Sequence, residues 1–495
     1  MSAPPSDPRQ GSAEDAVVAR AREGARLLTM RGVAMRGVTV ACNLALLGLV
    51  APAQLGLLAV VRAAMTIVQF AAELGVDRVL LRRPADPTRE EFAALAGLQA
   101  VVVAAMLAAG VASPGIYARL VHIDARWGAW LFGSIATMVV IPFGTGARVR
   151  LERALRYERL ATVDIMNVAI QNVGLVLAAL LHRFEVGVFV VFALMNVAVN
   201  LLLFAWSPGP RPAFRLARLR ALAGQSAGFM IAQWLGVLRE HAVPLLITRL
   251  FDIATAGVWA FAIRLSQLLN VTFEGFRAAA VPAAARVAHD RSALRRIAEH
   301  TFAGAAVLAG PVMALAFAGL PVVGQVWPQW RSAVPLAQTY VLAYGVAGIA
   351  DATLEPVAVT LFGAGVAFRQ QTAALAGVAA GLAGARLFGW PLTVAALGMA
   401  LAPTLVVLAY APRDVRPAAA QPGGALLHPL AVAVAAVGIA AVLRVPPVVP
   451  AGLTGGFCTW SIARCVLRAR AERTAGLGSR PTELLTTRKS VAAAT

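Results

Sequence analysis

The stretch Gly56–Arg83, GLLAVVRAAMTIVQFAAELGVDRVLLRR, decides the fold, because it is long and apolar enough to cross a bilayer as a helix. It nevertheless carries polar side chains at steps of i, i+4, i+7, i+11 and i+15. They are Arg62, Thr66, Gln69, Glu73 and Asp77. At about 100° per residue these side chains share one narrow face. A charge at the bilayer centre costs at least ~2.5–3.5 kcal/mol, so we expect this face to meet other helices or a water-filled cavity.

A second stretch of the same kind is Gly257–Arg277, GVWAFAIRLSQLLNVTFEGFR. It also begins with glycine, places an arginine and a glutamine (Arg264 and Gln267) in its middle, and ends near an acid, Glu274. Gly56 and Gly257 lie 201 residues apart. We interpret the two stretches as the same helix of a six-helix unit that occurs twice.

The composition excludes an ordinary soluble domain. Of the 495 residues 59% are hydrophobic and 14% charged, with a mean hydropathy of +0.73. Soluble domains are roughly half apolar and a quarter charged. The net charge of +20 comes largely from arginines in alternate loops. The positive-inside rule explains this pattern, so nucleic-acid binding is not expected. The spacing of cysteines and histidines indicates no disulfide framework and no metal site, and no cofactor is expected.

Apolar runs predict an all-α polytopic membrane protein with about 14 transmembrane helices. The helices are expected near 31–50, 55–80, 93–112, 128–146, 162–182, 186–206, 224–248, 257–280, 301–320, 336–360, 370–389, 391–411, 426–443 and 447–467. The predicted domains are a cytoplasmic N-terminal segment, two six-helix lobes, two extra helices and a cytoplasmic basic tail. Their ranges are 1–30, 31–222, 223–412, 413–467 and 468–495.

The charges of the loops predict the topology. Arginines cluster in the loops after the second, fourth, sixth and eighth helices, including Arg148–Arg159 and Ala285–His300. These loops and both termini should therefore be cytoplasmic. Because each lobe has an even number of helices, a pseudo-two-fold axis along the membrane normal should relate the lobes. The stretch Val326–Arg331, VWPQWR, is expected to form an aromatic interfacial loop.

Arg62 and Arg264 occupy similar places in the two lobes, so both could face one central cavity. The fork of an arginine suits a phosphate-bearing substrate. A third arginine, Arg239, lies at mid-helix beside Glu240 and His241, and Glu240 could neutralise it instead. The candidate cavity residues are Arg62, Gln69, Arg239, Arg264, Gln267, Tyr340 and Tyr344. The candidates for ion coupling are Glu73, Asp77, Glu274, Asp351 and Glu355.

Two alternatives to these roles stay open. Buried polar groups such as Asn196 and Asn200 could simply hydrogen-bond helices together, at ~0.6–2 kcal/mol each. A catalytic role is disfavoured, because no loop is long enough to fold as a catalytic domain and no phosphate-binding loop, nucleophile elbow or HExxH motif occurs. No catalytic residue is therefore predicted.

Three segments resemble the oligosaccharide flippases, the Wzx-type polysaccharide exporters. They read ELGVDRVLLRRPADPTREEFAALAGLQ, LERALRYERLATVDIMN and TAGVWAFAIRLSQLL followed by VPAAARVAHDRSALRRIAEH. The similarity covers roughly residues 25–410 and places the chain in the multidrug/oligosaccharidyl-lipid/polysaccharide exporter superfamily. The resemblance implies two six-helix lobes, a central cavity and alternating access. It also implies a polyprenyl-pyrophosphate-linked oligosaccharide that moves from the cytoplasmic to the outer leaflet.

The resemblance further implies a multi-pass protein of the cytoplasmic (inner) membrane. Its expected partners are the lipid-linked oligosaccharide, membrane lipids and other polysaccharide-assembly proteins. A cation-coupled multidrug exporter of the same fold is an alternative, and it would need an acidic or apolar cavity. A membrane-embedded glycosyltransferase or polymerase would need acidic metal ligands or a large outer loop. A scaffold subunit without transport activity is a further alternative.

Overall fold

The computed structural model describes residues 35, 37–73, 80–81, 86–113, 115–213, 234–363 and 365–410, except the side chains of 265–272, 278 and 282. No strand occurs in these ranges, which confirms the all-α prediction. The predicted N-terminal segment 1–30, the extra helices near 426–443 and 447–467 and the basic tail 468–495 lie outside the described residues. Their structure and the location of both termini remain predictions.

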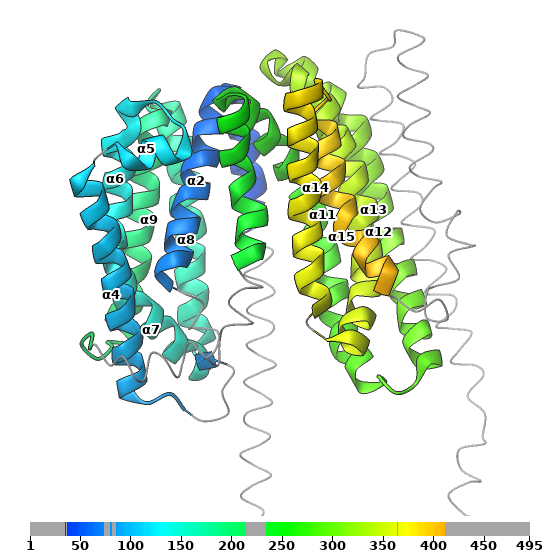
Figure 1. Cartoon of the computed structure of the whole chain (residues 1–495), viewed down its shortest axis with the longest axis horizontal. Coiled ribbons are helices and arrows are strands. Elements are labelled where there is room, and N and C mark those ends of the chain that lie inside the picture. The colour runs from blue at the N-terminus through cyan, green and yellow to red at the C-terminus, as the bar shows by residue number, and fades with distance from the viewer. Residues whose placement is uncertain are drawn as a thin grey trace, which may run out of the picture. The chain divides into compact units, whose positions relative to one another are not determined.

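The described helices follow the predicted apolar runs and exceed most of them in length (Figure 1). In the first half they are Gly37–Leu49, α2 (Pro52–Glu73), α4 (Arg89–Ala112), α5 (Ile116–Val121), η1 (Ala125–Trp127), α6 (Gly128–Ala136), η2 (Thr137–Val140), α7 (Ile141–Arg153), α8 (Tyr157–Leu180) and α9 (Phe184–Trp206). In the second half they are the helix 234–250, α11 (Ile253–Arg286), α12 (Arg291–Val326), η3 (Pro328–Ala333), α13 (Val334–Phe362), α14 (Gly365–Phe388) and α15 (Thr393–Tyr410).

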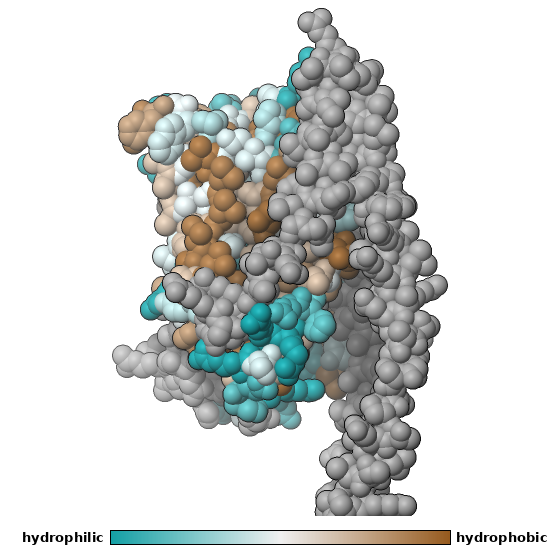
Figure 2. Space-filling view, turned by 90° about the vertical axis from the view of Figure 1, so that its right-hand side faces the viewer, coloured by the Kyte–Doolittle hydropathy of each residue, from teal (hydrophilic) through white to brown (hydrophobic). Residues whose placement is uncertain are grey.

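Among the described residues, eight helices are long and apolar enough to cross a membrane. The helix α12 shows how such a helix meets its surroundings. Leu308, Val312 and Leu315 form an exposed apolar stripe at i, i+4 and i+7, whereas the exposed Arg291 and Arg295 lie in its first turns. Figure 2 shows apolar residues over the middle of one face of the molecule and hydrophilic residues at its lower end. This pattern matches a lipid-facing belt with a wet, basic end.

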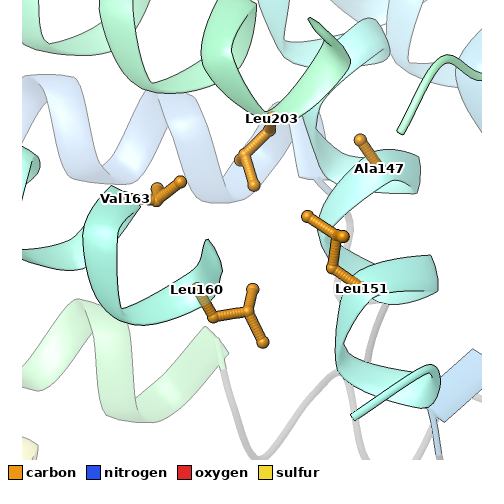
Figure 3. Packing of buried hydrophobic residues seen from close by; sticks show 5 residues of the cluster. All are labelled: Ala147, Leu151, Leu160, Val163 and Leu203. Atoms are coloured by element: carbon orange, nitrogen blue, oxygen red, sulfur yellow. The ribbon is translucent and has the colours of Figure 1, made fainter. Parts of the chain in front are cut away.

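The helices α7, α8 and α9 pack around a small apolar cluster (Figure 3). Ala147 and Leu151 of α7, Leu160 and Val163 of α8, and Leu203 of α9 point toward one another, and all are buried. Lipid tails are as apolar as leucine, so between transmembrane helices such packing stabilises chiefly through close van der Waals contact.

The helix that was predicted near 128–146 is interrupted, and two asparagines of α9 contact the region of the interruption. The 3₁₀ turn η2 separates α6 from α7, and Pro142 follows it directly. On α9, the Asn196 side chain donates to Thr137 Oγ1 at 3.1 Å, and Asn200 Nδ2 donates to Asn196 Oδ1 at 2.9 Å. The Asn200 amide also packs against Gly144, where a Cβ atom would lie only 1.9 Å from Asn200 Oδ1. The expectation that such asparagines hydrogen-bond helices together is therefore confirmed for Asn196, whereas Asn200 bonds within α9 and touches α7 only by packing.

The loops predicted at Arg148–Arg159 and Ala285–His300 are wrong in their extent, because helices continue into both. The helix α7 runs to Arg153 and α12 begins at Arg291. Hydropathy detects only the part of a helix inside the bilayer, whereas charged pairs at i, i+4 support its extension into water. Arg148 Nε donates to Glu152 Oε1 at 3.0 Å, and Arg295 pairs with Glu299 in the same way.

The carboxylate of Asp290 caps the start of α12. It accepts from the backbone N–H groups of Ser292 and Ala293, at 2.8 and 3.1 Å. These bonds and one from the Ser292 hydroxyl lower the pKa of Asp290. Such a cap satisfies N–H groups that have no partner within the helix, so α12 can begin in the aqueous phase.

The structure refines the predicted interfacial loop Val326–Arg331, whose location at the membrane interface remains a prediction. Its residues enter the 3₁₀ helix η3, and Trp330 is fully buried. The indole of Trp330 donates to Leu47 O at 2.8 Å and stacks on Phe261 with ring centroids 5.0 Å apart. Because a buried indole N–H needs a hydrogen-bond partner, this contact explains why a tryptophan can anchor the segment inside the protein.

The two repeated glycines meet each other. A Cβ atom on Gly56 would lie 1.8 Å from Ile253 O, and one on Gly257 would lie 1.8 Å from Pro52 O. Pro52 and Ile253, like Gly56 and Gly257, are 201 residues apart, so the contact is reciprocal. It therefore packs the start of α2 against the start of α11, while the six-helix repeat itself remains a prediction. Only glycine allows the two backbones to approach this closely.

The described residues form two compact units. The first contains the described residues up to Ile263, together with Trp327–Leu336 and Ala367–Pro403. The second contains Arg264–Val326, Ala337–Val366 and the described residues from Thr404. The boundary lies within α11, so this helix begins in one unit and continues in the other. The ranges of the two predicted lobes remain a prediction.

Candidate functional site

In the first unit, α2, which is long and apolar enough to cross a membrane, and the helix 234–250 bring charged groups together. Phe70 and Trp234 form an edge-to-face aromatic contact with ring centroids 5.1 Å apart. Further along the pair, Arg62 lies close enough to Glu240 and His241 for their charges to interact. The Arg62 side chain is exposed, although the flanking Val61 and Ala63 are buried.

Arg239 contributes a second guanidinium to the same place. Its Nη2 atom donates to Glu240 Oε1 at 3.1 Å, and the side chains of Arg239 and Glu240 are 27% and 59% exposed. The prediction that Glu240 could neutralise Arg239 is thus confirmed for this pair. The Arg239 Nε atom is buried and makes no hydrogen bond within the described part of the chain. One carboxylate consequently serves two arginines, which leaves this cluster with an excess of positive charge.

The structure does not place Arg62 and Arg264 at equivalent positions. Counted from the reciprocal glycine contact, Arg62 follows Gly56 by six residues, whereas Arg264 follows Gly257 by seven. The residue that corresponds to Arg62 is Ile263. One residue turns a helix by about 100°, so the two arginines project from different faces relative to the glycines. Arg264 is half-buried and belongs to the second unit, and its role in a shared cavity remains a prediction.

The polar face of α2 is partly bonded to itself. Gln69 Nε2 donates to Glu73 Oε1 at 2.8 Å, and both side chains are half-buried. This is the i, i+4 pair that the sequence pattern predicts. Asp77 lies outside the described residues. The proposed roles of Gln69 in substrate binding and of Glu73 and Asp77 in ion coupling remain predictions.

The second unit contains a charged cluster of a different kind. Arg277 Nε of α11 lies 3.3 Å from Glu355 Oε2 of α13, with side chains 36% and 24% exposed. One turn away on α13, Asp351 accepts from Thr404 Oγ1 of α15 at 3.2 Å. Here the two candidate ion-coupling carboxylates each contact a neighbouring helix. No group of three His, Cys, Asp or Glu side chains within the described ranges could hold a metal ion.

The remaining candidates of the second unit occupy mixed environments. Tyr340 is buried, and it stacks on Tyr344 with ring centroids 5.7 Å apart. Tyr344 is half-buried and also contacts Phe273. The Glu274 side chain is exposed, and the side chain of Gln267 lies outside the described residues. The tyrosine pair therefore contributes to packing, and its role in binding substrate remains a prediction.

Sequence reasoning did not select Glu240, His241 or Arg277 as site residues. A signal for Glu240 was present, because it adjoins Arg239 in an apolar helix. For Arg277 the signal was weaker, because its partner Glu355 is distant in sequence and on another helix. A single sequence shows which helices carry charges, but it does not show which of these helices are neighbours.

The family profile described as "Polysaccharide biosynthesis protein" matches residues 46–335, which include α2, the helix 234–250 and the start of α13. The chain belongs to the polysaccharide biosynthesis protein family. The match confirms the predicted resemblance to the Wzx-type polysaccharide exporters at the level of the family. It also spans the reciprocal contact between Gly56 and Gly257 and the arginine cluster of the first unit. No curated protein matches the chain.

Two solved membrane transporters resemble this family member in fold. The lipid II flippase MurJ in an inward closed conformation aligns with a TM-score of 0.64 and 10% identity, over 89% of this chain and 99% of MurJ. An inward-facing multidrug resistance MATE family transporter of the MOP superfamily aligns with a TM-score of 0.54 and 13% identity, over 75% and 92% of the two chains. Identities this low establish the fold alone.

Proposed function

We propose that this member of the polysaccharide biosynthesis protein family is a flippase for a polyprenyl-pyrophosphate-linked oligosaccharide. It carries the substrate across the cytoplasmic membrane by alternating access, for the synthesis of a surface polysaccharide. The observation that carries the proposal is the pair of arginines on neighbouring helices, Arg62 on α2 and Arg239 on the helix 234–250. Glu240 bonds to Arg239, and its charge also interacts with that of Arg62. The helix α2 is long and apolar enough to cross a membrane, and the proposal places the helix 234–250 beside it in the bilayer.

The chemistry of the pair suits a diphosphate. A guanidinium donates two parallel hydrogen bonds to phosphate oxygens and stays charged at any physiological pH. A charge within the bilayer is costly, so a family member that keeps two arginines beside one carboxylate needs a compensating anion. The diphosphate of the lipid-linked sugar supplies that anion, while the polyprenyl tail remains in lipid. Transport of this kind makes and breaks no covalent bond, so no catalytic residue and no cofactor are proposed.

A cation-coupled multidrug exporter of the same fold is the second candidate, and the likeness to the MATE transporter favours it. A binding site for cationic drugs would need an excess of carboxylates. The cluster formed by Arg62, Arg239 and Glu240 has the opposite balance. This difference in charge supports the flippase over the drug exporter. The family match to polysaccharide biosynthesis supports it independently.

The proposed location is the cytoplasmic membrane, with both termini in the cytoplasm. The arginine-rich start of α12 would then lie on the cytoplasmic side, where the positive-inside rule places Arg291, Arg295 and Arg296. A cysteine introduced at Ser292, which is exposed, would test this orientation in intact cells. A membrane-impermeant thiol reagent should leave it unlabelled, and labelling from outside would contradict the proposed topology.

The function is tested by substituting both arginines of the pair. In cells that lack the chromosomal copy, the variant Arg62→Ala with Arg239→Ala should restore surface polysaccharide at least about 100-fold less than the unmodified protein. Loss of two charge-assisted hydrogen bonds, at ~1.5–3 kcal/mol each, sets this scale. A matched control is Arg295→Ala, which removes an exposed arginine that pairs with Glu299. Full export by the double variant at equal membrane abundance would contradict the proposal.

A further inference from the structure

The ion pair between Arg239 and Glu240 is poorly suited to holding the fold together. Residues adjacent in a helix do not face each other, so the long arginine side chain must bend around the helix to reach its neighbour. The Glu240 side chain is 59% exposed, and exposed pairs contribute only ~0–1 kcal/mol. By contrast, Arg148 bonds to Asp164 on the next helix and joins α7 to α8. Glu240 joins no helices through its bond to Arg239.

Glu240 nevertheless interacts with two cations. It accepts a hydrogen bond from Arg239 on its own helix, and its charge interacts with that of Arg62 on α2. Arg62 itself has no ion pair within 4.0 Å among the residues that the structure describes. The carboxylate therefore partly neutralises both guanidiniums without fully satisfying either. A ligand with several acceptor oxygens could satisfy both at once.

We propose that Glu240 is an internal competitor for the anionic headgroup of the substrate. Its carboxylate neutralises Arg62 and Arg239 between transport cycles, and the phosphate oxygens displace it when the substrate binds. The carboxylate returns as the substrate leaves, which keeps the two arginines from retaining the headgroup. This inference rests on the proposed function and adds a release step to it. Tight binding alone would slow turnover, because an interaction that is equally strong before and after translocation does not speed the transfer.

The experiment compares the full-length protein with Glu240→Gln, which removes the charge and keeps the shape. Inorganic pyrophosphate serves as the probe, and isothermal titration calorimetry in detergent micelles measures its dissociation constant. The inference predicts about tenfold tighter binding to Glu240→Gln, which corresponds to about 1.4 kcal/mol. Glu240→Asp keeps the competing charge and should bind as the unmodified protein does. Glu299→Gln, which removes an exposed carboxylate bonded to Arg295, is the matched control and should change nothing.

Turnover supplies a second readout. In proteoliposomes that contain a fluorescent lipid-linked oligosaccharide, Glu240→Gln should flip the substrate several-fold more slowly than the unmodified protein. Glu240→Asp should largely retain the rate. A merely structural role would instead weaken binding and lower the rate together, and would not tighten binding of the probe.

Several outcomes would overturn the inference. Unchanged or weaker pyrophosphate binding by a folded Glu240→Gln protein would do so, as would no binding by either protein. If Glu240→Gln does not fold, Glu240→Ala takes its place, and failure of both neutral variants would assign the carboxylate a structural role instead. The proposed function has a separate test, because the unmodified protein must flip the lipid-linked substrate whatever Glu240 does. Flipping without the Glu240 effect removes only the inference, whereas no flipping removes the function.

Discussion

The two charged clusters of the molecule use similar residues in opposite ways. In the first unit Arg62 and Arg239 share one exposed carboxylate, and Arg62 has no ion-pair partner in the described part of the chain. In the second unit Arg277 of α11 meets Glu355 of α13, and Asp351 of α13 meets Thr404 of α15. The first cluster has an excess of positive charge, whereas each described contact of the second joins helices. A charged residue in a membrane helix therefore indicates either a binding site or a packing contact, depending on its partners.

If Arg62 binds substrate and does not stabilise the fold, another contact must hold α2 in place. The reciprocal contact of Gly56 and Gly257 has this role. Gly56→Ala would put a methyl group 1.8 Å from Ile253 O, where backbone cannot move aside cheaply. The expected loss is about 3 kcal/mol or more in the free energy of unfolding, or failure to fold. Denaturant unfolding in micelles measures it. Gly133→Ala, where a Cβ atom meets nothing within 4 Å, should unfold as the unmodified protein does.

The second cluster should respond to loss of charge with a loss of stability. Glu355→Gln leaves the half-buried Arg277 without its carboxylate and should cost about 2 kcal/mol in unfolding free energy. Replacing Arg277 by Met in the same protein should recover most of this cost, because no uncompensated charge then remains. A double-mutant cycle in micelles measures the coupling. Additive costs would show that the pair does not interact.

A smaller effect is expected where α15 contacts α13. Thr404→Val keeps the shape of the side chain and removes the hydroxyl that donates to Asp351 Oδ1 at 3.2 Å. The free energy of unfolding should fall by about 1 kcal/mol. Thr372→Val is the control, because the exposed Thr372 hydroxyl bonds only to the carbonyl of Phe368 in its own helix. Equal effects of the two substitutions would mean that the contact between α13 and α15 adds nothing.

The smallest change in stability is expected at the first cluster. Arg62→Met removes an exposed charge with no described ion pair and should alter the free energy of unfolding by less than about 0.5 kcal/mol. Its export activity should nevertheless fall, because Arg62 contributes one of the two phosphate-binding guanidiniums. Unfolding in micelles and surface polysaccharide in cells measure the two effects. A large loss of stability with normal export would mean that Arg62 stabilises the fold and does not bind substrate.

The helices, their ends and the position of Trp330 differ in how well the sequence predicts them. Apolar runs predicted the existence and order of the described helices, because the bilayer imposes a minimum apolar length. Their ends were misjudged at Arg148–Arg159 and Ala285–His300, because ion pairs and caps extend helices into water without an apolar signal. The burial of Trp330 was not predicted, because its indole donates to Leu47 O almost 300 residues away in sequence. The residues around Trp330 in the sequence do not indicate that Leu47 is its hydrogen-bond partner.

The sequence by itself determined that the chain is an all-α membrane protein with a repeated glycine-led helix and intramembrane charges. Those properties follow from local composition, because each side chain within the bilayer is stabilised or destabilised according to its own polarity. Only the tertiary structure decided that Gly56 and Gly257 touch and which arginines have partners. The interaction of a charge depends on the nearest atoms of other helices, and helix packing alone brings these atoms together.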